Sequence, residues 1–416
     1  MIQVIGVEEE QGIAEKAYAV HPRTVAETAR MRHCLPDGGL GAYLSSMAPK
    51  ALNVPLDSDH WEWGGPPPVL GEHRGEKCLC FPESFTVAAA RNLSLTDGVI
   101  QARVSVPRAR SFHGLVWRCQ DRENYESFFV RPHQVGNPDS IQYTPVFNDV
   151  SCWQLYHGEG FWAPILFPID EWFVIRVAFA GQAAEVYVED LARPVLRCEL
   201  KASRAPGRVG ILCSGPGLRV AGFSAGPSAD PTDPAVQAVP RPHPQPDAGA
   251  IRSWWISSTV PEAEIAGVST LAPGARRELT WDRLDAEPSG LANIARVRRI
   301  EERRNTVFAT AVIRSSRQQR KALAFGFSDR ATVFLNGRAL FRGEDAFRSR
   351  DYRFLGSIGY WDTVYLPLEK GENQLVIAVS EDFGGWGVQA RFADREGIEL
   401  PDQHDASGTP VWNGVD

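Results

Sequence analysis

The chain has 416 residues, and 44 Lys and Arg against 51 Asp and Glu give a net charge of −7. This balance argues against nucleic acid as a partner, and the sequence holds no run of 18 apolar residues that could span a membrane. With 37 Gly, 30 Pro and 10% aromatic residues, the composition favours short strands joined by turns. We therefore expect an all-β protein of several domains.

Residues 1–50 are predicted to form an N-terminal extension that is partly helical. Thr24-Val-Ala-Glu27 has the pattern of a capping box at the start of a short helix. The beginning of the chain carries Glu8, Glu9 and Glu10 where a signal peptide needs basic residues and then an apolar run. We therefore expect a cytoplasmic protein, or a secreted one if a leader has been removed.

Residues 51–227 are predicted to form a β-sandwich. Short segments rich in β-branched and aromatic residues alternate there with Gly, Pro, Asn and Asp, and the β-α-β alternation of a parallel sheet is absent. The predicted strands are 85–95, 98–106, 112–120, 125–133, 141–148, 152–158, 172–181, 184–190, 195–201, 207–214 and 218–226. The scattered cysteines, with Cys78-x-Cys80 as the one close pair, are typical of free buried thiols rather than of a zinc site.

Residues 228–250 contain six prolines and no periodic apolar pattern, so they are predicted to be a linker. Residues 251–400 are again rich in strand-like segments and predict a second sandwich or jelly roll. Within it, Asn336-Gly337 predicts a two-residue hairpin turn, because a type I′ turn needs positive φ at both positions. Residues 401–416 are predicted to be a tail.

A hairpin between residues 112–119 and 125–130 holds the first candidate site residues. With a turn at 120–124, we expect Arg118 opposite Glu126, Val116 opposite Phe128 and Gly114 opposite Val130, all on one face. One interpretation is that the Arg118 guanidinium and the Glu126 carboxylate both take part in the function. A plain cross-strand ion pair is the alternative.

Aromatic and amide side chains follow on neighbouring predicted strands, and such a set is what a sugar site needs. Aromatic rings cover the C–H face of a sugar ring, and amide, guanidinium and carboxylate groups bind its hydroxyls. Ordinary core packing is the alternative for the aromatic residues. The candidate substrate-binding residues are Arg118, Arg131, Gln142, Tyr143, Trp153, Tyr156 and His157.

Glycoside hydrolysis at such a site would need a proton donor and usually a second carboxylate. Glu126 is the first candidate for acid or base, and the candidate catalytic set is Glu126, His133 and Asp121. For Asp121, the alternative is a turn cap with Asn124. Asp149, Glu159 and His157 are further partners to consider. No cofactor is expected, although Asp139, Asp149 and carbonyl oxygens leave a calcium ion as an alternative.

The segment Gly114-Leu-Val-Trp-Arg118, followed after a turn by Tyr125-Glu126, resembles the concave-face signature of the 3-keto-disaccharide hydrolase-like family. The segments 207–212 and 220–224 resemble the closing strands of such domains, so the resemblance covers about residues 51–226. It implies a concanavalin A-like lectin/glucanase sandwich, related to laminin G domains and glycoside hydrolase family 16. It also implies that Arg118 and Glu126 lie on a concave, carbohydrate-binding face.

Two departures from the family patterns concern the mechanism more than the fold. Glu126-Ser-Phe128 stands where the family tends to have Glu-x-Gln, and the Glu-x-Asp-x-x-Glu strand of family 16 is absent. Residues 328–337 and 383–387 of the second domain resemble galactose-binding-like jelly rolls. That resemblance implies a sugar site at strand ends, with tight turns and core packing as the alternative. Its candidate residues are Asp351, Arg353, Trp361, Glu381, Asp382 and Trp386.

Two functions follow from these patterns. The first is a carbohydrate-active enzyme, a glycoside hydrolase or a lyase-like relative, acting on a glycoside or small oligosaccharide. The second is a non-catalytic, lectin-like glycan-binding protein. The expected partner in both is a carbohydrate, with no nucleic acid and no membrane. Sugar identity, linkage, anomeric outcome and oligomeric state do not follow from the sequence.

Overall fold

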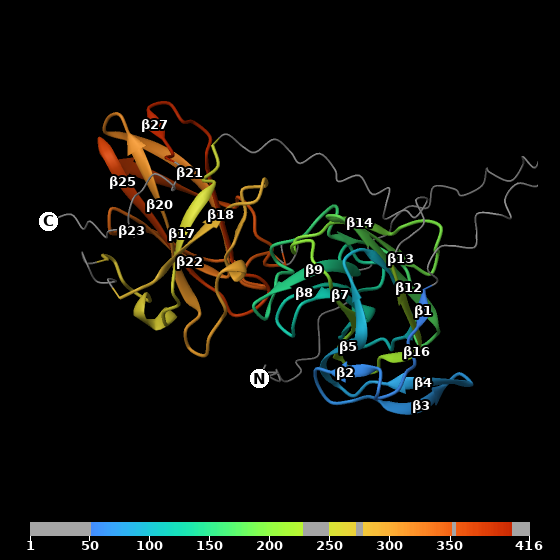
Figure 1. Ribbon diagram of the computed structural model, residues 1–416. Helices are drawn as coiled ribbons and strands as arrows, with labels where there is room; N and C mark the ends of the chain where they lie inside the picture. Colours follow the sequence, from blue (N-terminus) through green and yellow to red (C-terminus); the bar gives the residue numbers. More distant parts are fainter. Residues whose placement is uncertain (1–50, 228–248, 272–277, 352–354, 402–416) are drawn as a thin grey trace, which may run out of the picture. The chain divides into compact units, whose positions relative to one another are not determined.

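A computed structural model gives the structure of the chain (Figure 1), and it describes residues 51–227, 249–271, 278–351 and 355–401. All of these residues belong to one compact unit that begins at Ala48. The predicted N-terminal extension and tail, and nearly all of the predicted linker, lie outside the described residues. The predicted domain boundaries therefore stay predictions.

The first sandwich consists of two antiparallel sheets. One follows the order β14-β13-β12-β6-β16-β4-β3, with β1 paired to β16. Its strands are β1 (Leu52–Asn53), β3 (Val69–His73), β4 (Glu76–Cys80), β6 (Gly98–Ser105), β12 (Phe173–Ala180), β13 (Ala183–Val188), β14 (Leu196–Glu199) and β16 (Arg219–Gly226). The other follows the order β10-β9-β8-β7-β15-β5-β2, with β11 paired to β9. Its strands are β2 (Trp61–Trp63), β5 (Ser84–Leu95), β7 (Phe112–Cys119), β8 (Tyr125–Val130), β9 (Ile141–Phe147), β10 (Val150–Ser151), β11 (Trp162–Ala163) and β15 (Gly207–Gly215).

The core of this sandwich lies between its two sheets, because alternate residues of each strand point to the same side. Trp117 and Phe128 from one sheet meet Ile175 and Phe179 from the other in one fully buried cluster. Burying a side chain of this size stabilises the fold by roughly 2–3 kcal/mol. In Figure 1, β7, β8 and β9 lie side by side, as their pairing requires.

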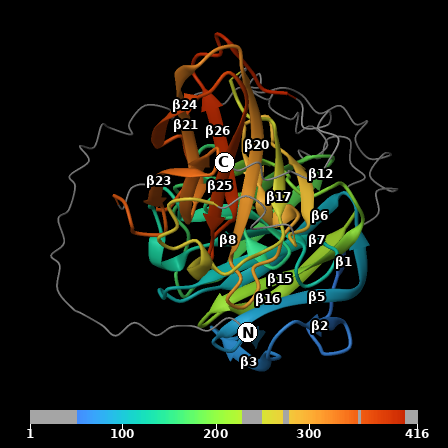
Figure 2. The same ribbon diagram turned by 90° about the vertical axis from the view of Figure 1, so that its left-hand side faces the viewer.

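The second sandwich consists of two further antiparallel sheets. The larger follows the order β18-β17-β20-β25-β22-β23, with β27 paired to β20, and the smaller the order β19-β26-β21-β24. The strands of the larger are β17 (Ser253–Ser257), β18 (Trp281–Asp285), β20 (Thr306–Ser315), β22 (Arg330–Leu335), β23 (Arg338–Glu344), β25 (Gly371–Ser380) and β27 (Ile398–Glu399). Those of the smaller are β19 (Ala292–Asn293), β21 (Gln319–Ser328), β24 (Asp362–Leu368) and β26 (Gly387–Phe392). Figure 2 shows β17, β20 and β25 running alongside one another.

These sheets confirm the prediction of an all-β chain with two successive sandwiches. The described residues contain no α-helix, only the 3-10 turns η1 (Pro132–Gln134), η2 (Glu262–Glu264) and η3 (Ile294–Arg296). The predicted hairpin turn is also confirmed: Asn336 and Gly337 have φ of 49° and 81° between β22 and β23. No helix in the described part of the chain is long and apolar enough to cross a membrane.

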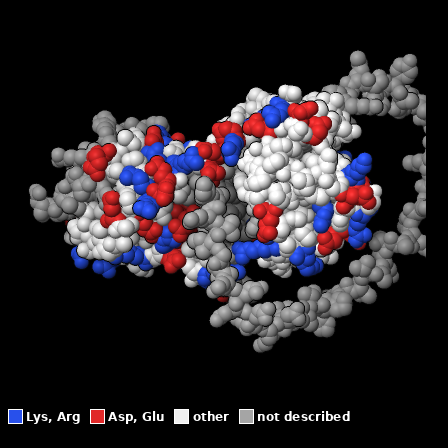
Figure 3. All heavy atoms as spheres, turned by 90° about the horizontal axis from the view of Figure 1, so that it is seen from below, with Lys and Arg blue, Asp and Glu red and all other residues white. Residues whose placement is uncertain are grey.

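Basic and acidic side chains are interspersed on the face that Figure 3 shows. Many of them form exposed ion pairs, such as Arg103 with Glu76 and Arg299 with Glu123. Exposed pairs of this kind contribute at most about 1 kcal/mol each. This face shows no wide basic area of the kind that binds a phosphate backbone.

Candidate functional site

The register of the β7–β8 hairpin differs from the predicted one. Trp117, not Arg118, lies opposite Glu126, and Val116 lies opposite Ser127. The cause is a β-bulge: β7 holds one residue more than β15 over the paired stretch, and Arg118 has a φ of 48°. A bulge places two successive side chains on the same side of a strand. The predicted register of Arg118 opposite Glu126 is therefore wrong, although both side chains lie on the inner side and the charge of each affects the pKa of the other.

The bulge turns Arg118 toward the opposite sheet. Its guanidinium donates to the carbonyl oxygens of Thr96 and Gly181 and pairs with Asp97 at 3.2 Å. It also lies 5.8 Å from the centre of the Phe179 ring, and its side chain is fully buried. Arg118 thus ties together the turns that follow β5 and β12, and the prediction that it lies on an exposed concave face is wrong.

Glu126 lies on the inner side of its sheet as well, and it is fully buried. Its carboxylate accepts hydrogen bonds from the Tyr143 hydroxyl at 2.6 Å and from the backbone N–H groups of Lys201 and Ala202 at 3.1 and 2.8 Å. Burial raises the pKa of Glu126, and the Tyr143 hydrogen bond opposes that rise. Both oxygens are occupied by protein donors, so Glu126 and Tyr143 join the sheets instead of facing a substrate.

The sequence resemblance assigned carbohydrate to the face of Arg118 and Glu126, which is the inner one, and the outer face of this sheet is the one left to consider. It carries an apolar cluster that includes Val87, Val116, Phe129 and Leu212. In β7, β8, β9 and β15, the residues on that face include no Asp or Glu. Because hydrolysis of a glycoside usually needs two carboxylates, these four strands do not supply a hydrolytic site there.

Two of the predicted substrate-binding residues, Arg131 and Gln142, do lie together in one polar network. The Arg131 guanidinium donates to Gln142 Oε1 and to the Asp139 carbonyl oxygen, and it lies 4.9 Å from the centre of the Phe129 ring. Burial lowers the pKa of Arg131 to about 10. Gln142 Nε2 donates to the carbonyl oxygens of Trp153 and Tyr156, each at 2.8 Å. The network therefore positions the loop 152–157.

The two remaining candidate catalytic residues lie apart from Glu126 and from each other. Asp121 is exposed, and its carboxylate accepts from the Glu123 backbone N–H and from Asn124 Nδ2, so it caps a turn. His133 lies in η1 with its ring edge-to-face against Phe112. Burial, together with the charges of neighbouring arginines, lowers its pKa. No interaction among the described residues joins Glu126, Asp121 and His133.

Residues 152–158 were predicted to be a strand and are instead a loop that packs into the second sandwich. Cys152, Leu155 and Tyr156 belong to the apolar cluster of that sandwich. The Tyr156 hydroxyl donates to Glu287, and His157 Nε2 lies 2.7 Å from the Ile358 carbonyl oxygen. These contacts use the polar atoms that were predicted to bind sugar.

Trp153 is half-buried, and its ring contacts two aromatic rings of the second sandwich. Its ring centre lies 5.8 Å from that of Phe347 and 6.2 Å from that of Phe383. Phe383 is 58% exposed, while Trp153 and Phe347 are half-buried. We call these three rings the aromatic surface. They come from the loop after β10, the loop after β23 and the turn before β26.

Glycine allows this close approach of the loop to the turn between β25 and β26. Gly384 and Gly385 have φ of 110° and 139°, which only glycine adopts readily. A Cβ at Gly384 would lie 1.9 Å from Gln154 Oε1 and 2.9 Å from the Trp153 ring. The backbone N–H of Gln154 donates to the Gly384 carbonyl oxygen at 2.7 Å. The tight-turn alternative for this Gly-Gly pair is correct, and the turn also carries Phe383.

The residue before Phe383 is the acid Asp382. The Asp382 carboxylate is 57% exposed and binds the Arg330 guanidinium at 2.9 and 3.0 Å. Arg330 also binds Glu262 through two hydrogen bonds, and Asn305 donates to Asp382. The set thus holds a 57%-exposed carboxylate in the residue next to the one exposed ring of the aromatic surface, that of Phe383. Trp386, by contrast, is fully buried, and its indole N–H donates to the Val379 carbonyl oxygen.

Three buried acids lie near the turn that carries Asp382 and Phe383: Asp329, Asp345 and Glu381. Asp329 accepts from the Asp382 backbone N–H and from Gln154, and burial raises its pKa to about 6. Burial raises the pKa of Asp345 to about 7, although Arg350 pairs with it at 3.0 Å. Neither carboxylate oxygen of Glu381 has a well-aligned hydrogen-bond donor. Burial and the negative charge of Asp329 raise its pKa.

Metal ligation finds no support at the predicted positions. Asp139 pairs with Arg131, and Asp149 lies 3.8 Å from Arg299. Within the described ranges, no group of three or more His, Cys, Asp or Glu side chains is placed to hold a metal ion. Of the second-domain candidates, Arg353 lies outside the described residues, and Trp361 is 45% exposed, with its indole N–H donating to the Ser357 carbonyl oxygen.

Several residues of this region were not predicted: Phe347, Gln154, Asp329 and Asp345. An isolated phenylalanine among charged residues, as in Glu344-Asp-Ala-Phe347-Arg, is one signal that could have pointed to an exposed ring. The burial of Asp329 and Asp345 has no such signal, because it depends on which loops cover them.

Comparison with known proteins gives no family assignment, since no family model and no curated protein matches the chain. Solved structures do match. The carbohydrate-binding module CBM66 from Bacillus subtilis has 12% identity and a TM-score of 0.30, over 39% of this chain and 91% of that one. The Bacillus licheniformis β-glucanase has 9% identity and a TM-score of 0.31, over 42% and 97%.

A third match is the exoplasmic/lumenal domain of VIP36 in its Ca²⁺/Man3GlcNAc-bound form. It has 10% identity and a TM-score of 0.32, over 45% of this chain and 92% of that one. The expected likeness to lectin and glucanase sandwiches is thus confirmed as a likeness. With TM-scores this low, it carries no argument about function.

Proposed function

We propose that this protein binds carbohydrate at the aromatic surface formed by Trp153, Phe347 and Phe383. The exposed Phe383 ring beside the Asp382–Arg330 pair carries the proposal. A sugar presents C–H groups on one face and hydroxyls at its edge, so an exposed ring packed against a half-buried one, with a charged pair in the neighbouring residue, matches both. The motif resemblance in the sequence points to the same ligand class.

The location differs from the one that the sequence resemblance implied. Hydrogen bonds within the protein already occupy the polar groups of Arg118, Glu126, Tyr143 and Gln142. Trp153 is shared by both assignments, since it was a candidate of the first sandwich and its ring meets Phe383 of the second. The proposed site therefore combines candidates from both predicted sugar sites.

Phe383→Ala is expected to weaken glycan binding about tenfold, because it removes the exposed ring of the aromatic surface. The measurement is calorimetric titration with gluco-, galacto- and 3-keto-disaccharides and longer oligosaccharides. Tyr365→Ala is the matched control, since Tyr365 is a 66% exposed ring on β24. Unchanged affinity in Phe383→Ala, or no binding by any glycan of the panel, would refute the proposal.

Glycoside hydrolysis is a second candidate function, and one observation favours it. Asp329 and Glu381 lie together below the aromatic surface, with raised pKa values of the kind that a proton donor needs at neutral pH. Both side chains are almost fully buried, however, at 2% and 0% exposure. Their burial keeps them out of reach of a sugar on the surface, and binding is therefore the function that the geometry supports best.

The two functions separate in a product assay. The same glycans are incubated with the protein, and products are resolved by chromatography. A product that disappears in Glu381→Gln or Asp329→Asn but persists in Glu126→Gln would establish hydrolysis at the second sandwich. A product lost only in Glu126→Gln would restore the sequence-based assignment. Binding without product would establish the lectin-like function.

A further inference from the structure

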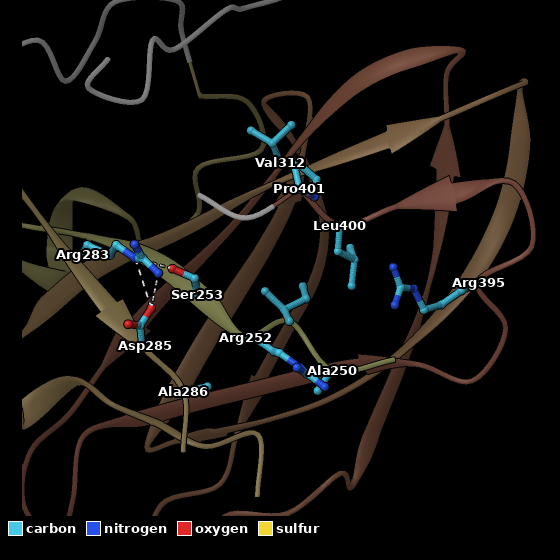
Figure 4. Close-up of a pocket in the computed structure, with 11 residues that line it drawn as sticks. Ala250, Arg252, Ser253, Arg283, Asp285, Ala286, Val312, Arg395, Leu400 and Pro401 are labelled. Carbon is cyan, nitrogen blue, oxygen red and sulfur yellow. Dashed lines mark hydrogen bonds and ion pairs between the residues drawn. The ribbon is translucent and has the colours of Figure 1, made fainter. Parts of the chain in front are cut away.

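A pocket of about 520 Å³ in the second sandwich contains no thiol or imidazole in its lining (Figure 4). In its wall, Arg283 donates to the Asp285 carboxylate at 2.7 Å and to the Ser253 hydroxyl at 2.9 Å. These polar groups are thus engaged with one another. The reactive side chains outside the aromatic surface lie in the first sandwich.

Two thiols of the first sandwich lie close together. Cys78 and Cys80 are two residues apart on β4, so both side chains point to the same side of the strand. Their sulfur atoms are 3.8 Å apart. In the described part of the chain, this is the one pair of cysteine sulfurs in contact, and both cysteines are free thiols.

The strand geometry allows a bond between the two sulfurs. Residues two apart on a strand have Cα atoms about 6.6 Å apart, at the upper end of the roughly 4.4–6.8 Å that a disulfide spans. The bond shortens the sulfur separation from 3.8 Å to about 2.05 Å. Such a bond is strained, and strained disulfides are reduced readily.

The surroundings of the pair leave room for this movement. β4 pairs with β16 at Leu79 and Cys80, whereas Cys78 has a strand partner on one side alone, Gly71 of β3. The backbone at Cys78 is therefore held less firmly than that at Cys80. A Cβ at Gly71 would lie 2.7 Å from Cys80 Sγ, so the glycine keeps space beside that sulfur.

The two thiols differ in access. Cys78 is 1% exposed, and burial raises its pKa to about 11, with the hydrogen bond to Cys80 acting in the same direction. It therefore stays protonated and unreactive at neutral pH. Cys80 is partly exposed. An oxidant in solution meets the Cys80 sulfur first.

We propose that Cys78 and Cys80 form a reversible dithiol–disulfide site that reacts with a small disulfide of the oxidised glutathione type. The Cys80 thiolate attacks one sulfur of the oxidant, breaks its S–S bond and releases one glutathione thiolate. Cys78 then gives its proton to solvent, and its sulfur attacks Cys80 Sγ and displaces the second glutathione. Two protein thiols are oxidised, the small disulfide is reduced to two thiols, and these take up the two protons. This site is independent of glycan binding at the aromatic surface.

The test incubates the full chain with oxidised glutathione at pH 8 and then unfolds it and labels the remaining thiols with N-ethylmaleimide. Tryptic cleavage after Lys77 and Arg91 places both cysteines in the peptide 78–91. We expect most of this peptide to lose both labels and two hydrogens, and to take both labels after treatment with dithiothreitol. Cys119 and Cys213, buried free thiols of the same sandwich, are the internal controls and are expected to keep their labels.

Two variants separate the roles of the thiols. Cys78→Ser is expected to stop at the mixed disulfide, with one glutathione on Cys80, and Cys80→Ser is expected to leave Cys78 labelled. Full labelling of both cysteines in the oxidised wild-type peptide would overturn the proposal, and so would a disulfide that joins either of them to another cysteine. Glutathione on Cys78 in Cys80→Ser would overturn the assigned order of attack. The wild-type result decides the matter even if a variant does not fold.

Discussion

Replacing Arg118 with alanine is expected to lower the free energy of unfolding by about 3–5 kcal/mol, the effect of breaking a buried, hydrogen-bonded charge pair. The substitution leaves the carbonyl oxygens of Thr96 and Gly181 without their donor. It also removes one of the two arginines that pair with Asp97. Arg118→Lys keeps the charge but cannot reach several acceptors at once, so an intermediate loss is expected.

The measurement is equilibrium unfolding in urea at neutral pH. Arg103→Ala is the control, because Arg103 is half-exposed and pairs with Glu76 at the surface. Its substitution is expected to change stability by less than about 1 kcal/mol. If Arg118→Ala is no more harmful than Arg103→Ala, then the bulge does not place Arg118 as described, and the outward orientation predicted from the sequence becomes the better account.

Raising the pH from 4.5 to 8 is expected to destabilise the protein through its buried acids. The pKa of Asp329 is about 6 in the folded chain against 3.8 as the ordinary value. Since the folded state binds this proton more tightly, its stability is complete below pH 3.8 and is lost as the pH rises through 6. The shift corresponds to about 3 kcal/mol. Asp345, with a pKa of about 7, acts in the same direction.

Asp329→Asn isolates this effect, because asparagine stays neutral and can still accept from the Asp382 backbone N–H. Relative to the variant, wild-type protein is expected to lose about 2 kcal/mol between pH 4.5 and 8 in urea unfolding, because Asp329 of the unfolded chain is already mostly ionised at pH 4.5. Asp382→Asn serves as the control at an exposed neighbouring carboxylate. A difference between wild type and Asp329→Asn that stays constant with pH would contradict the burial of a protonated Asp329.

The strands were readable from the sequence because each one buries a regular apolar set. Predicted segments such as 112–120 and 207–214 coincide with β7 and β15, and Asn336-Gly337 forms the expected turn. The segment 152–158 has the same apolar and aromatic content but forms a loop. Its apolar residues are buried against the second sandwich, and one segment viewed alone does not reveal which partner buries it.

The candidate site could be predicted less well from the sequence, because the position of its side chains depends on single residues. One extra residue in β7 turns Arg118 inward and changes the residue opposite Glu126. A one-residue shift moves side chains to the other face, and no turn signal in the sequence announces a bulge. Trp153 was predicted to bind sugar, but its neighbours Phe347 and Phe383 are some 200 residues away in the chain.

The central claim is that carbohydrate binds at the aromatic surface, and hydrogen–deuterium exchange with a bound glycan tests it most directly. The panel glycan with the highest affinity is compared with the free protein, segment by segment. We predict slower exchange on binding in residues 152–157, 345–351 and 381–386, with β7 and β8 unchanged. Protection confined to β7 and β8, the strands that the sequence resemblance assigned to carbohydrate, would contradict the account.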